Sequence, residues 1–314
     1  MSRIVVTGGS GFIGSHVVDV LVERGHDVTV LDHRVPPHRR DVAFEDVDLL
    51  DLASVLAATR GAEHVFHLAA VSNVNQAHRD PVHTLSLNVI GTSHVLEAAR
   101  LHGGQRVHLA STVWVYNGAS PGAALADETT PFQLSGAGHV YTSSKMAAEM
   151  VCQNYRALYG VPVTILRYGI PYGPRMREEL LIPRFIRRAL EGEPLQVNGR
   201  GEQFRSFLYV NDLAQAHVHA LGPTAMNQVY NLEGPRKVTV LEVAERIRRL
   251  VGQAGGLPEM EWAAIEFTPE RAGDFAGRAV SNEKAERELG WRPAVDFEDG
   301  LRETVAWFRK RWGL

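Results

Sequence analysis

Short apolar runs recur along the first half of the chain, and a stretch with apolar residues at helical spacing follows nearly every one. Apolar runs bounded by polar turns are typical of buried strands, whereas a spacing of three or four residues predicts amphipathic helices. The predicted strands lie at 4–6, 26–31, 42–48, 62–68, 105–110 and 161–167, and the predicted helices at 15–24, 51–58, 83–101 and 143–159. This alternation predicts an α/β fold with a Rossmann-like, doubly wound parallel sheet.

The pattern changes in the second half of the chain. Helical spacing predicts helices at 180–191, 210–221, 240–251 and 301–312, and the strand-like segment 228–232 is expected to return to the main sheet. We therefore predict a larger domain over 1–168 with a returning segment of about 207–234. A smaller C-terminal α/β domain would comprise 169–206 and 235–314.

The turn after the first predicted strand reads TGGSGFIG and spans 7–14. Gly8 permits a tight turn, Gly11 lets the backbone approach a pyrophosphate, and Gly14 lets the helix pack closely on the strand. The helix N-terminus then offers free N–H groups to the phosphates. Asp32 closes the second predicted strand, where a carboxylate accepts a hydrogen bond from a ribose. A glycine-rich turn alone also serves as a plain connector, but this context predicts a dinucleotide site.

The charge near Asp32 indicates which dinucleotide would bind. A carboxylate accepts from the 2′-hydroxyl of a ribose and repels a 2′-phosphate, which favours NAD. Arg34 lies close in sequence and leaves NADP as the alternative.

Tyr141 and Lys145 are four residues apart and so lie on one face of a predicted helix. For a tyrosine to act as a base near neutrality its pKa must fall by about 3 units from about 10, which corresponds to roughly 4 kcal/mol. A lysine ammonium at ~4 Å contributes about 4 kcal/mol at an effective dielectric constant of ~20. The pair is therefore sufficient for proton abstraction, although a chance pair at an exposed helix start remains open.

Two hydroxyl residues, Ser111 and Thr112, follow the predicted strand 105–110. Ligands of doubly wound sheets bind at this carboxyl edge. A hydroxyl there can bond a substrate oxygen and share a proton with Tyr141, although Ser and Thr are also ordinary residues at strand ends.

In combination these features resemble the extended short-chain dehydrogenase/reductase family, specifically its nucleotide-sugar epimerases and dehydratases. The resemblance runs from about Arg3 to Phe308. It rests on TGGSGFIG (7–14), Asp32, Asp48-Leu49, HLAA (67–70), Asn88, Ser111-Thr112, YTSSK (141–145), LRYGIPYGP (166–174), RSFLYVNDLA (205–214), RAGD (271–274) and ELGWRP (288–293).

The resemblance implies a nicotinamide dinucleotide in the 1–168 domain and a nucleotide sugar in the smaller domain. Tyr141 would be the general base, with Lys145 on the nicotinamide ribose and Thr112 on the sugar hydroxyl. The implied cofactor contacts are Gly8, Gly11, Phe12, Ile13, Asp32, Asp48, Leu49, Ala69, Ala70, Asn88, Tyr141, Lys145 and Tyr168. The implied substrate contacts are Ser111, Thr112, Arg177, Arg205, Arg271, Asp274 and Arg278. The family also suggests a homodimer through the helices near 83–101 and 143–159.

Arginines in the smaller domain match family residues that face the nucleotide diphosphate, namely Arg205 and Arg271, and a guanidinium suits phosphate geometrically. Asp274 matches an acid near the nucleotide's ribose. Surface ion pairs are the alternative interpretation of all three residues.

The residues after Thr112 bear on the reaction. Dehydratases and decarboxylases of this family carry acidic residues there, whereas this chain has Val113 and Trp114. Neither side chain transfers a proton, so the sequence predicts oxidation and re-reduction at one sugar hydroxyl, which is 4-epimerisation.

The sugar is suggested by departures from the family pattern. Gly169-Ile170 replaces a large residue followed by Asn or Thr, which departs from the glucose/galactose enzymes. Arg177 has the spacing of a carboxylate-binding arginine in UDP-glucuronate 4-epimerases, and Arg278 falls near a sugar-lining position; either could be a solvated loop arginine. UDP-glucuronate is the leading candidate. The alternatives are a UDP-glucose/UDP-galactose 4-epimerase, a nucleotide-keto-sugar reductase and a non-catalytic dinucleotide-binding protein.

Composition narrows the classes further. A chain of 314 residues with 45% hydrophobic and 22% charged residues can bury a sizeable core. The net charge of −3 gives no bias toward nucleic acid or anionic membranes. The single Cys152 excludes a disulfide framework, and no metal-site motif is present, so no metal is predicted. No apolar run reaches the length of a membrane span, and the first strand begins too early for a signal peptide, so a cytoplasmic protein is expected.

Overall fold

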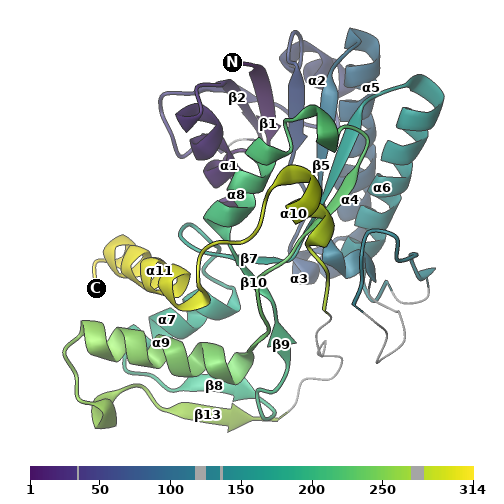
Figure 1. Ribbon diagram of the computed structural model, residues 1–314. Coiled ribbons are helices and arrows are strands. Elements are labelled where there is room, and N and C mark those ends of the chain that lie inside the picture. Colours follow the sequence, from purple (N-terminus) through teal and green to yellow (C-terminus); the bar gives the residue numbers. More distant parts are fainter. Residues whose placement is uncertain (34, 117–124, 135–136, 270–278) are drawn as a thin grey trace. The chain divides into compact units, whose positions relative to one another are not determined.

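The computed structural model describes residues 1–33, 35–116, 125–134, 137–269 and 279–314 (Figure 1). The chain divides into two compact units, each built from separate segments. Unit 1 comprises Met1–Gly169, Leu213–Leu232 and Val280–Arg292, and unit 2 comprises Ile170–Asp212, Glu233–Ala279 and Pro293–Leu314. The sequence had assigned 280–292 to the smaller domain. It groups with unit 1 because helix α10 (Glu283–Leu289) packs on strand β11 (Val229–Leu232).

Unit 1 contains a seven-stranded parallel sheet in the order β11-β6-β5-β4-β1-β2-β3. The strands other than β11 span Arg3–Thr7, Asp27–Asp32, Ala43–Asp46, His64–His67, Arg106–Thr112 and Val163–Tyr168 for β1 to β6. The chain runs from β1 to β2 and β3 on one side and then crosses to β4 on the other. Ligands of open parallel sheets bind outside the carboxyl ends of the strands at such a reversal, here between β1 and β4.

Two apolar layers cover the faces of this sheet. Alternate residues of β1 point to opposite faces, so Val5 faces one layer while Ile4 and Val6 face the other. Helices α2 (Leu52–Ala58), α5 (Thr92–His102) and α6 (Val140–Tyr159) pack on the first face. Helices α1 (Phe12–Glu23) and α8 (Val210–His219) contribute apolar residues to the layer on the second face (Figure 1). The first three residues of α8 belong to unit 2.

The predicted helix 83–101 is interrupted in the structure. Helix α4 (Pro81–Leu85) leads into a π-helical turn, η1 (Ser86–Gly91), and only then into α5. Such turns cluster at functional sites, and a hydrophobic pattern does not register their extra residue. Here the turn carries the buried Asn88, whose side chain bonds the segment after β4. The remaining helix of this region, α3 (Val74–Arg79), was not predicted.

Other boundaries also moved. Helix α1 begins at Phe12 instead of residue 15, because Gly11 is its N-cap and the glycine turn enters the helix directly. Strand β3 covers only Ala43–Asp46 and is exposed along its length, which shortens the apolar prediction of 42–48.

Unit 2 combines helices α7 (Leu181–Leu190), α9 (Val240–Ala254) and α11 (Phe297–Trp312), which pack on one another, with short strand pairs. The parallel pairs are β7 (Ile170–Tyr172) with β10 (Phe207–Tyr209) and β8 (Leu195–Asn198) with β13 (Ile265–Thr268), and the antiparallel pair is β9 (Phe204–Arg205) with β12 (Val238–Thr239). These short strands were missed because two to four residues show no periodicity.

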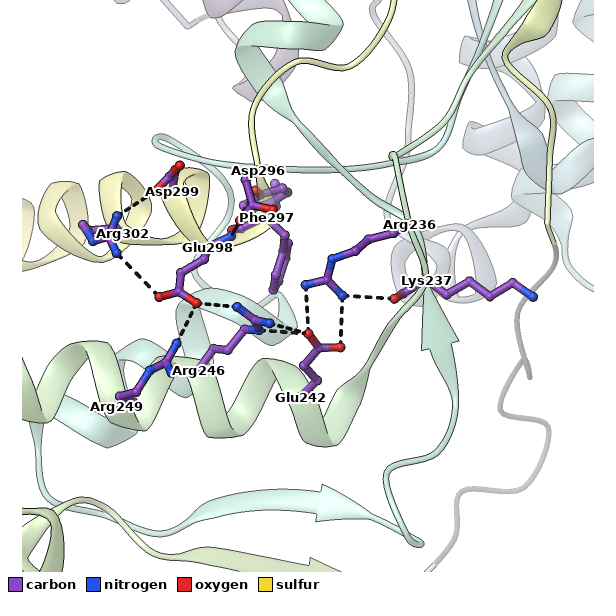
Figure 2. A network of polar contacts seen from close by, with 11 residues as sticks. Arg236, Lys237, Glu242, Arg246, Arg249, Asp296, Phe297, Glu298, Asp299 and Arg302 are labelled. Carbon is purple, nitrogen blue, oxygen red and sulfur yellow. Dashed lines mark hydrogen bonds and ion pairs between the residues drawn. The ribbon is translucent and has the colours of Figure 1, made fainter.

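A network of ion pairs links α9 to α11 in unit 2 (Figure 2). Glu298 of α11 bonds Arg246 and, at 2.6 Å, Arg249. Glu242 of α9 bonds Arg236 at 2.8 Å and Arg246 at 2.9 Å. These side chains are 26–40% exposed, so the network lies where water still reaches it.

Membrane-spanning helices and clusters of metal-binding side chains are both absent from the described residues. No helix in this part of the chain is long and apolar enough to cross a membrane. Nor does any group of three or more His, Cys, Asp or Glu side chains in the described ranges have the arrangement of a metal site.

Candidate active site

The glycine turn joins β1 to α1 at the reversal of the sheet. Gly8 has a φ of +71°, and a Cβ built there would lie 2.6 Å from the backbone nitrogen of Ala69. A Cβ on Gly14 would lie 2.1 Å from the carbonyl oxygen of Gly8. Both positions therefore accept only glycine, one for its backbone conformation and the other for close packing of helix on turn.

Helix α1 presents its N-terminus at this turn. Gly11 is the N-cap and makes no side-chain cap, and the N–H groups of Phe12 and Ile13 follow in the first turn, where a helix offers no internal acceptor. Free N–H groups and the positive end of the helix dipole suit a diphosphate. A glycine-rich turn, in front of an N-terminus that no side chain caps, fits the pyrophosphate of NAD.

Asp32 ends β2 beside the same turn. Its Oδ2 accepts the N–H of Ser10 at 3.0 Å, and its Oδ1 accepts the N–H of His33 at 2.8 Å. These bonds fix the carboxylate at the edge where the adenosine ribose is expected. Asp48 and Leu49 follow β3; Asp48 accepts the N–H of Leu50 at 2.9 Å, and Leu49 is buried.

A buried chain of hydrogen bonds connects β1, β4 and α5 behind the site. Thr92 donates to the carbonyl of Asn88 at 2.6 Å, so its oxygen accepts from Nε2 of His67 at 3.0 Å. The other nitrogen, Nδ1, then accepts from the hydroxyl of Thr7 at 2.8 Å, and Thr7 accepts the N–H of Ala69 at 3.3 Å. Burial lowers the pKa of His67 to about 3, in agreement with a neutral ring. Each hydrogen bond in this series therefore has a single possible donor and acceptor.

The side chain of Asn88 extends this network to α6. Its Nδ2 donates to the hydroxyl of Ser144 at 2.9 Å and to the carbonyl of Val71 at 3.0 Å, and its Oδ1 accepts the N–H of Val71 at 2.8 Å. Ser144 in turn donates to the carbonyl of Tyr141 at 2.7 Å. Asn88 therefore supports the first turn of α6. Ala70, also expected near the cofactor, lies half-buried between Ala69 and Val71.

Contacts through Ala110 and Trp114 connect the end of β5, where Thr112 lies, to Tyr141 and Lys145 of α6. Lys145 is buried and its Nζ donates to the carbonyl of Ala110 at 2.9 Å, and burial lowers the pKa of this lysine to about 8. Thr112 accepts the N–H of Trp114 at 3.2 Å, and the ring of Trp114 lies 6.3 Å from the ring of Tyr141. Lys145 and Trp114 thus connect the end of β5 to the first turns of α6.

Ser111 lies elsewhere. Successive side chains of a strand point to opposite faces, and the buried hydroxyl of Ser111 donates to Glu149. Glu149 also pairs with Arg167 at 2.7 Å, with side chains only 4% and 6% exposed. This hydroxyl belongs to a buried ion-pair network with Glu149 of α6, which leaves Thr112 as the strand-end hydroxyl outside that network.

The hydroxyl of Tyr168 is also engaged in the interior. Nδ1 of His217 lies 2.9 Å from the carbonyl of Leu213, which accepts only, so Nε2 is the acceptor for Tyr168 at 2.6 Å. Burial lowers the pKa of His217 to about 4 and raises the pKa of Tyr168 well above its usual range. Tyr168 can contribute its backbone or ring face to a cofactor, while its hydroxyl is occupied.

The substrate residues expected in the second half lie in unit 2 or outside the described residues. Arg177 follows β7 and lies 3.5 Å from Glu179, with a side chain 39% exposed. Arg205 in β9 is half-buried and donates to the carbonyl of Phe204 at 2.7 Å. The remaining three, Arg271, Asp274 and Arg278, fall outside the described ranges.

Several residues that the structure places in or behind the site had no predicted role. The half-buried Trp114 and His139 lie beside Tyr141. The buried Thr7, His67 and Thr92 form the chain of hydrogen bonds behind the site, which we call the relay. His67 and Thr7 stand inside recognised motifs, which was the available signal; Thr92 and His139 had none.

Comparison with known proteins gives a consistent picture. The profile of the NAD dependent epimerase/dehydratase family matches residues 4–232. A UDP-N-acetyl-alpha-D-glucosaminuronate decarboxylase of Bacillus cytotoxicus is 33% identical over 98% of both chains. A dTDP-glucose 4,6-dehydratase of Neisseria gonorrhoeae is 35% identical over 98% of this chain and 95% of its own. Thermus thermophilus UDP-glucose 4-epimerase, solved in complex with NAD, superposes with a TM-score of 0.85 at 34% identity, covering 98% of this chain and 99% of that one.

Proposed function

The chain belongs to the NAD-dependent epimerase/dehydratase family, and from this premise we propose that it is a 4-epimerase of a UDP-sugar. The observation that carries the proposal is the pair Val113 and Trp114 directly after Thr112. A buried valine and a half-buried indole offer no group that exchanges a proton with a sugar carbon. Oxidation of one hydroxyl and its reversal need only a base and a hydride acceptor, and Tyr141 is intact.

In the proposed reaction Tyr141 takes the proton of the C4 hydroxyl, to which Thr112 holds a hydrogen bond. C4 would give its hydride to bound NAD, and after the 4-keto sugar has turned over in the site the same hydride would return to its opposite face, which inverts C4. Lys145 binds the nicotinamide ribose, and its ammonium favours the ionised form of the phenol. Return of the proton from Tyr141 completes the exchange, so the cofactor stays resident over each cycle.

The remaining cofactor contacts follow the order of the turn and the strand ends. Gly8, Gly11, Phe12 and Ile13 hold the diphosphate, Asp32 the adenosine ribose, and Asp48 and Leu49 the adenine. Ala69 and Ala70 line the path to the nicotinamide, and Asn88 supports α6 behind it. The carboxylate of Asp32, held by the backbone N–H of Ser10, supports this assignment.

We propose UDP-glucuronate as the leading substrate. Arg177 would bind the sugar carboxylate, and a relative at 33% identity is named for a uronate sugar. Arg205, Arg271 and Asp274 would hold the nucleotide, with Arg278 near the sugar. UDP-glucose and UDP-galactose are the second candidate pair, because a structural neighbour at 34% identity is a UDP-glucose 4-epimerase.

The decisive experiment uses purified protein without added cofactor and a panel of UDP- and dTDP-sugars in deuterium oxide. We expect NMR to detect the C4 epimer of UDP-glucuronate without deuterium at C4, because the hydride returns from the cofactor. Tyr141→Phe should lower the rate by about 10²–10⁴-fold. Arg177→Ala should raise KM for UDP-glucuronate more than for UDP-glucose.

Four results would contradict the proposal. Release of carbon dioxide with deuterium at C5 would indicate a decarboxylase. A 4-keto-6-deoxy product would indicate a dehydratase. A strict need for added reduced dinucleotide would indicate a keto-sugar reductase, and no turnover of any sugar with NAD bound would favour a non-catalytic dinucleotide-binding protein.

We also propose a homodimer through the helices on one face of unit 1. Large apolar side chains there are 43–73% exposed, namely Val82, Leu85, Ile90, Leu101, Met150 and Leu158. Apolar exposure of this kind is typical of interaction sites. Analytical ultracentrifugation should give twice the chain mass, and Met150→Glu combined with Leu158→Glu should shift it to the monomer. A monomeric parent protein would contradict the assignment.

A further inference from the structure

Helix α6 is capped by a histidine. His139 precedes the first helical residue, Val140, and its Nδ1 accepts the N–H of Thr142 at 3.2 Å and lies 3.1 Å from the hydroxyl of Thr142. Histidine is not among the preferred N-cap residues, which are Asn, Asp, Ser and Thr. Tyr141 is the second residue of this helix, so the turn held by the cap is the turn that carries the phenol.

The imidazole of His139 also packs against two aromatic rings. Its centroid lies 5.0 Å from the ring of Trp114 at an interplanar angle of 56°, and 6.1 Å from the ring of Tyr141 at 32°. Trp114 and Tyr141 meet edge to face at 6.3 Å. The three rings contact one another in pairs, so a displacement of the imidazole displaces the phenol.

The hydrogen bonds define the charge state of His139. A nitrogen that accepts a backbone N–H carries a lone pair, so the ring is neutral with its proton on Nε2. Burial lowers the pKa of His139, and His78 on α3 lowers it further. A positive charge would also oppose the positive end of the dipole of α6. Among the described residues, the titratable groups that act on or contact the imidazole are His78 and Tyr141.

We propose that His139 is a positioning residue for Tyr141, holding the first turn of α6 while neutral and releasing it when protonated. This inference rests on the proposed function, in which Tyr141 is the base. A proton on Nδ1 would set two donors, Nδ1–H and the N–H of Thr142, against each other. The carbonyl of Tyr141 stays tied to Ser144, so the helix persists while the phenol loses its orientation.

The test compares two substitutions in the NAD-bound protein. Asparagine at this position offers a capping oxygen that does not titrate, whereas alanine offers none. We expect His139→Ala to lower kcat by roughly tenfold at pH 8, where the parent cap is intact, and by less at acid pH, where the parent loses its cap as well, with KM unchanged. His139→Asn should restore most of that loss at pH 8 and lose the part of the acid limb that protonation of His139 causes, keeping only the part due to the ionisation of Tyr141. An acid limb of unchanged midpoint in His139→Asn would overturn the proposal.

A second readout does not depend on turnover. A protonated imidazole quenches the fluorescence of an indole in contact with it, so acidification should dim the parent protein along a single histidine titration. The change should disappear in Trp114→Phe and in His139→Asn. A quench that persists in His139→Asn would overturn the inference even where epimerisation is found. If no nucleotide sugar reacts, the proposed function fails while this titration still reports the cap.

Discussion

The interior of unit 1 and the face of unit 2 both hold networks of charged or polar side chains, but they are built in opposite ways. In unit 1, Glu149 and Arg167 are 4% and 6% exposed and also bond Ser111 and Tyr116. In unit 2, Glu298 and its arginine partners are 26% exposed or more, so water reaches them (Figure 2). Among the described residues unit 2 has more ion pairs than unit 1. The free energy lost when one partner is removed is expected to be larger for the buried pair of unit 1.

The physical reason is desolvation. A buried charge whose partner is removed has no water to replace it, whereas a half-exposed charge is solvated again at once. The same difference applies to hydrogen bonds: the relay through His67 admits a single arrangement of protons, while Arg246 in Figure 2 contacts the carboxylates of both Glu242 and Glu298. Orientation near the site therefore comes from groups that have no alternative partner.

The largest effect is expected for Glu149→Ala. Removal of this carboxylate leaves the guanidinium of Arg167 buried and unpaired, so the free energy of unfolding should fall by about 3–5 kcal/mol in urea denaturation. The matched control is Glu97→Ala, which removes a half-exposed partner of Arg100 on α5 and should cost less than about 1 kcal/mol. Equal losses in the two variants would remove the distinction between buried and exposed pairs.

Gly14→Ala tests the close packing of the turn on α1. The added Cβ would lie 2.1 Å from the carbonyl oxygen of Gly8. Overpacking of this kind should cost about 1–3 kcal/mol and displace the turn, so the purified protein should lose its NAD. Gly222→Ala is the control, because its Cβ would meet an atom no closer than 3.6 Å. Full retention of NAD by Gly14→Ala would show that the turn tolerates a side chain.

The buried histidines of unit 1 should make the protein sensitive to acid. Burial lowers the pKa of His67 to about 3 and of His217 to about 4, and lowers the pKa of His108 well below its usual range. Their contribution is complete above about pH 6.5, the unfolded pKa, and is lost as pH falls toward the folded pKa because only the unfolded chain takes up protons. Each histidine should add up to about 1.4 kcal/mol per pH unit to the loss.

Urea denaturation between pH 8 and pH 5 measures this slope. His108→Phe is the informative variant, since phenylalanine can fill the place against Phe66, whose ring lies 4.3 Å from that of His108. Its slope should be smaller than that of the parent by one proton. An unchanged slope would mean that His108 is not neutral in the folded state.

Glu298→Gln should have the smallest effect. The substitution weakens half-exposed pairs that each contribute about 0.2–1 kcal/mol, and the loss should shrink further in 1 M salt because exposed charges are screened. Glu149→Ala should keep its full effect in the same salt. A large, salt-independent loss for Glu298→Gln would place the network of Figure 2 in the same class as the buried pair.

How far the sequence could predict the molecule depends on whether a feature is local. Strand, glycine turn and helix occupy consecutive residues, so Gly8, Gly14 and the role of β1 followed from the pattern. The alternation of side chains along a strand also predicts that Ser111 and Thr112 point to opposite faces. The relay from Thr7 through His67 to Thr92 joins residues 60 and 25 positions apart, and only folding brings them together.

The π-helical turn at Ser86–Gly91 illustrates the same limit. An apolar pattern predicts one continuous helix there, because a single extra residue barely shifts the periodicity. The turn places Asn88 so that its side chain bonds Val71 and Ser144. These partners lie far away in the sequence, so no local pattern predicts the bonds. His139 was missed for a related reason, since histidine is an uncommon cap and carries no capping signature.

The discontinuous make-up of unit 1 has a consequence for synthesis of the chain. Strand β11, which pairs with β6, lies about sixty residues downstream of it, and the last segment of the unit ends only at Arg292. While the ribosome is still producing the intervening residues, the nascent sheet exposes the apolar edge of Val163–Tyr168, a surface open to aggregation. Translation speed and chaperone access between residues 169 and 229 should therefore govern the yield of folded protein more than any later step.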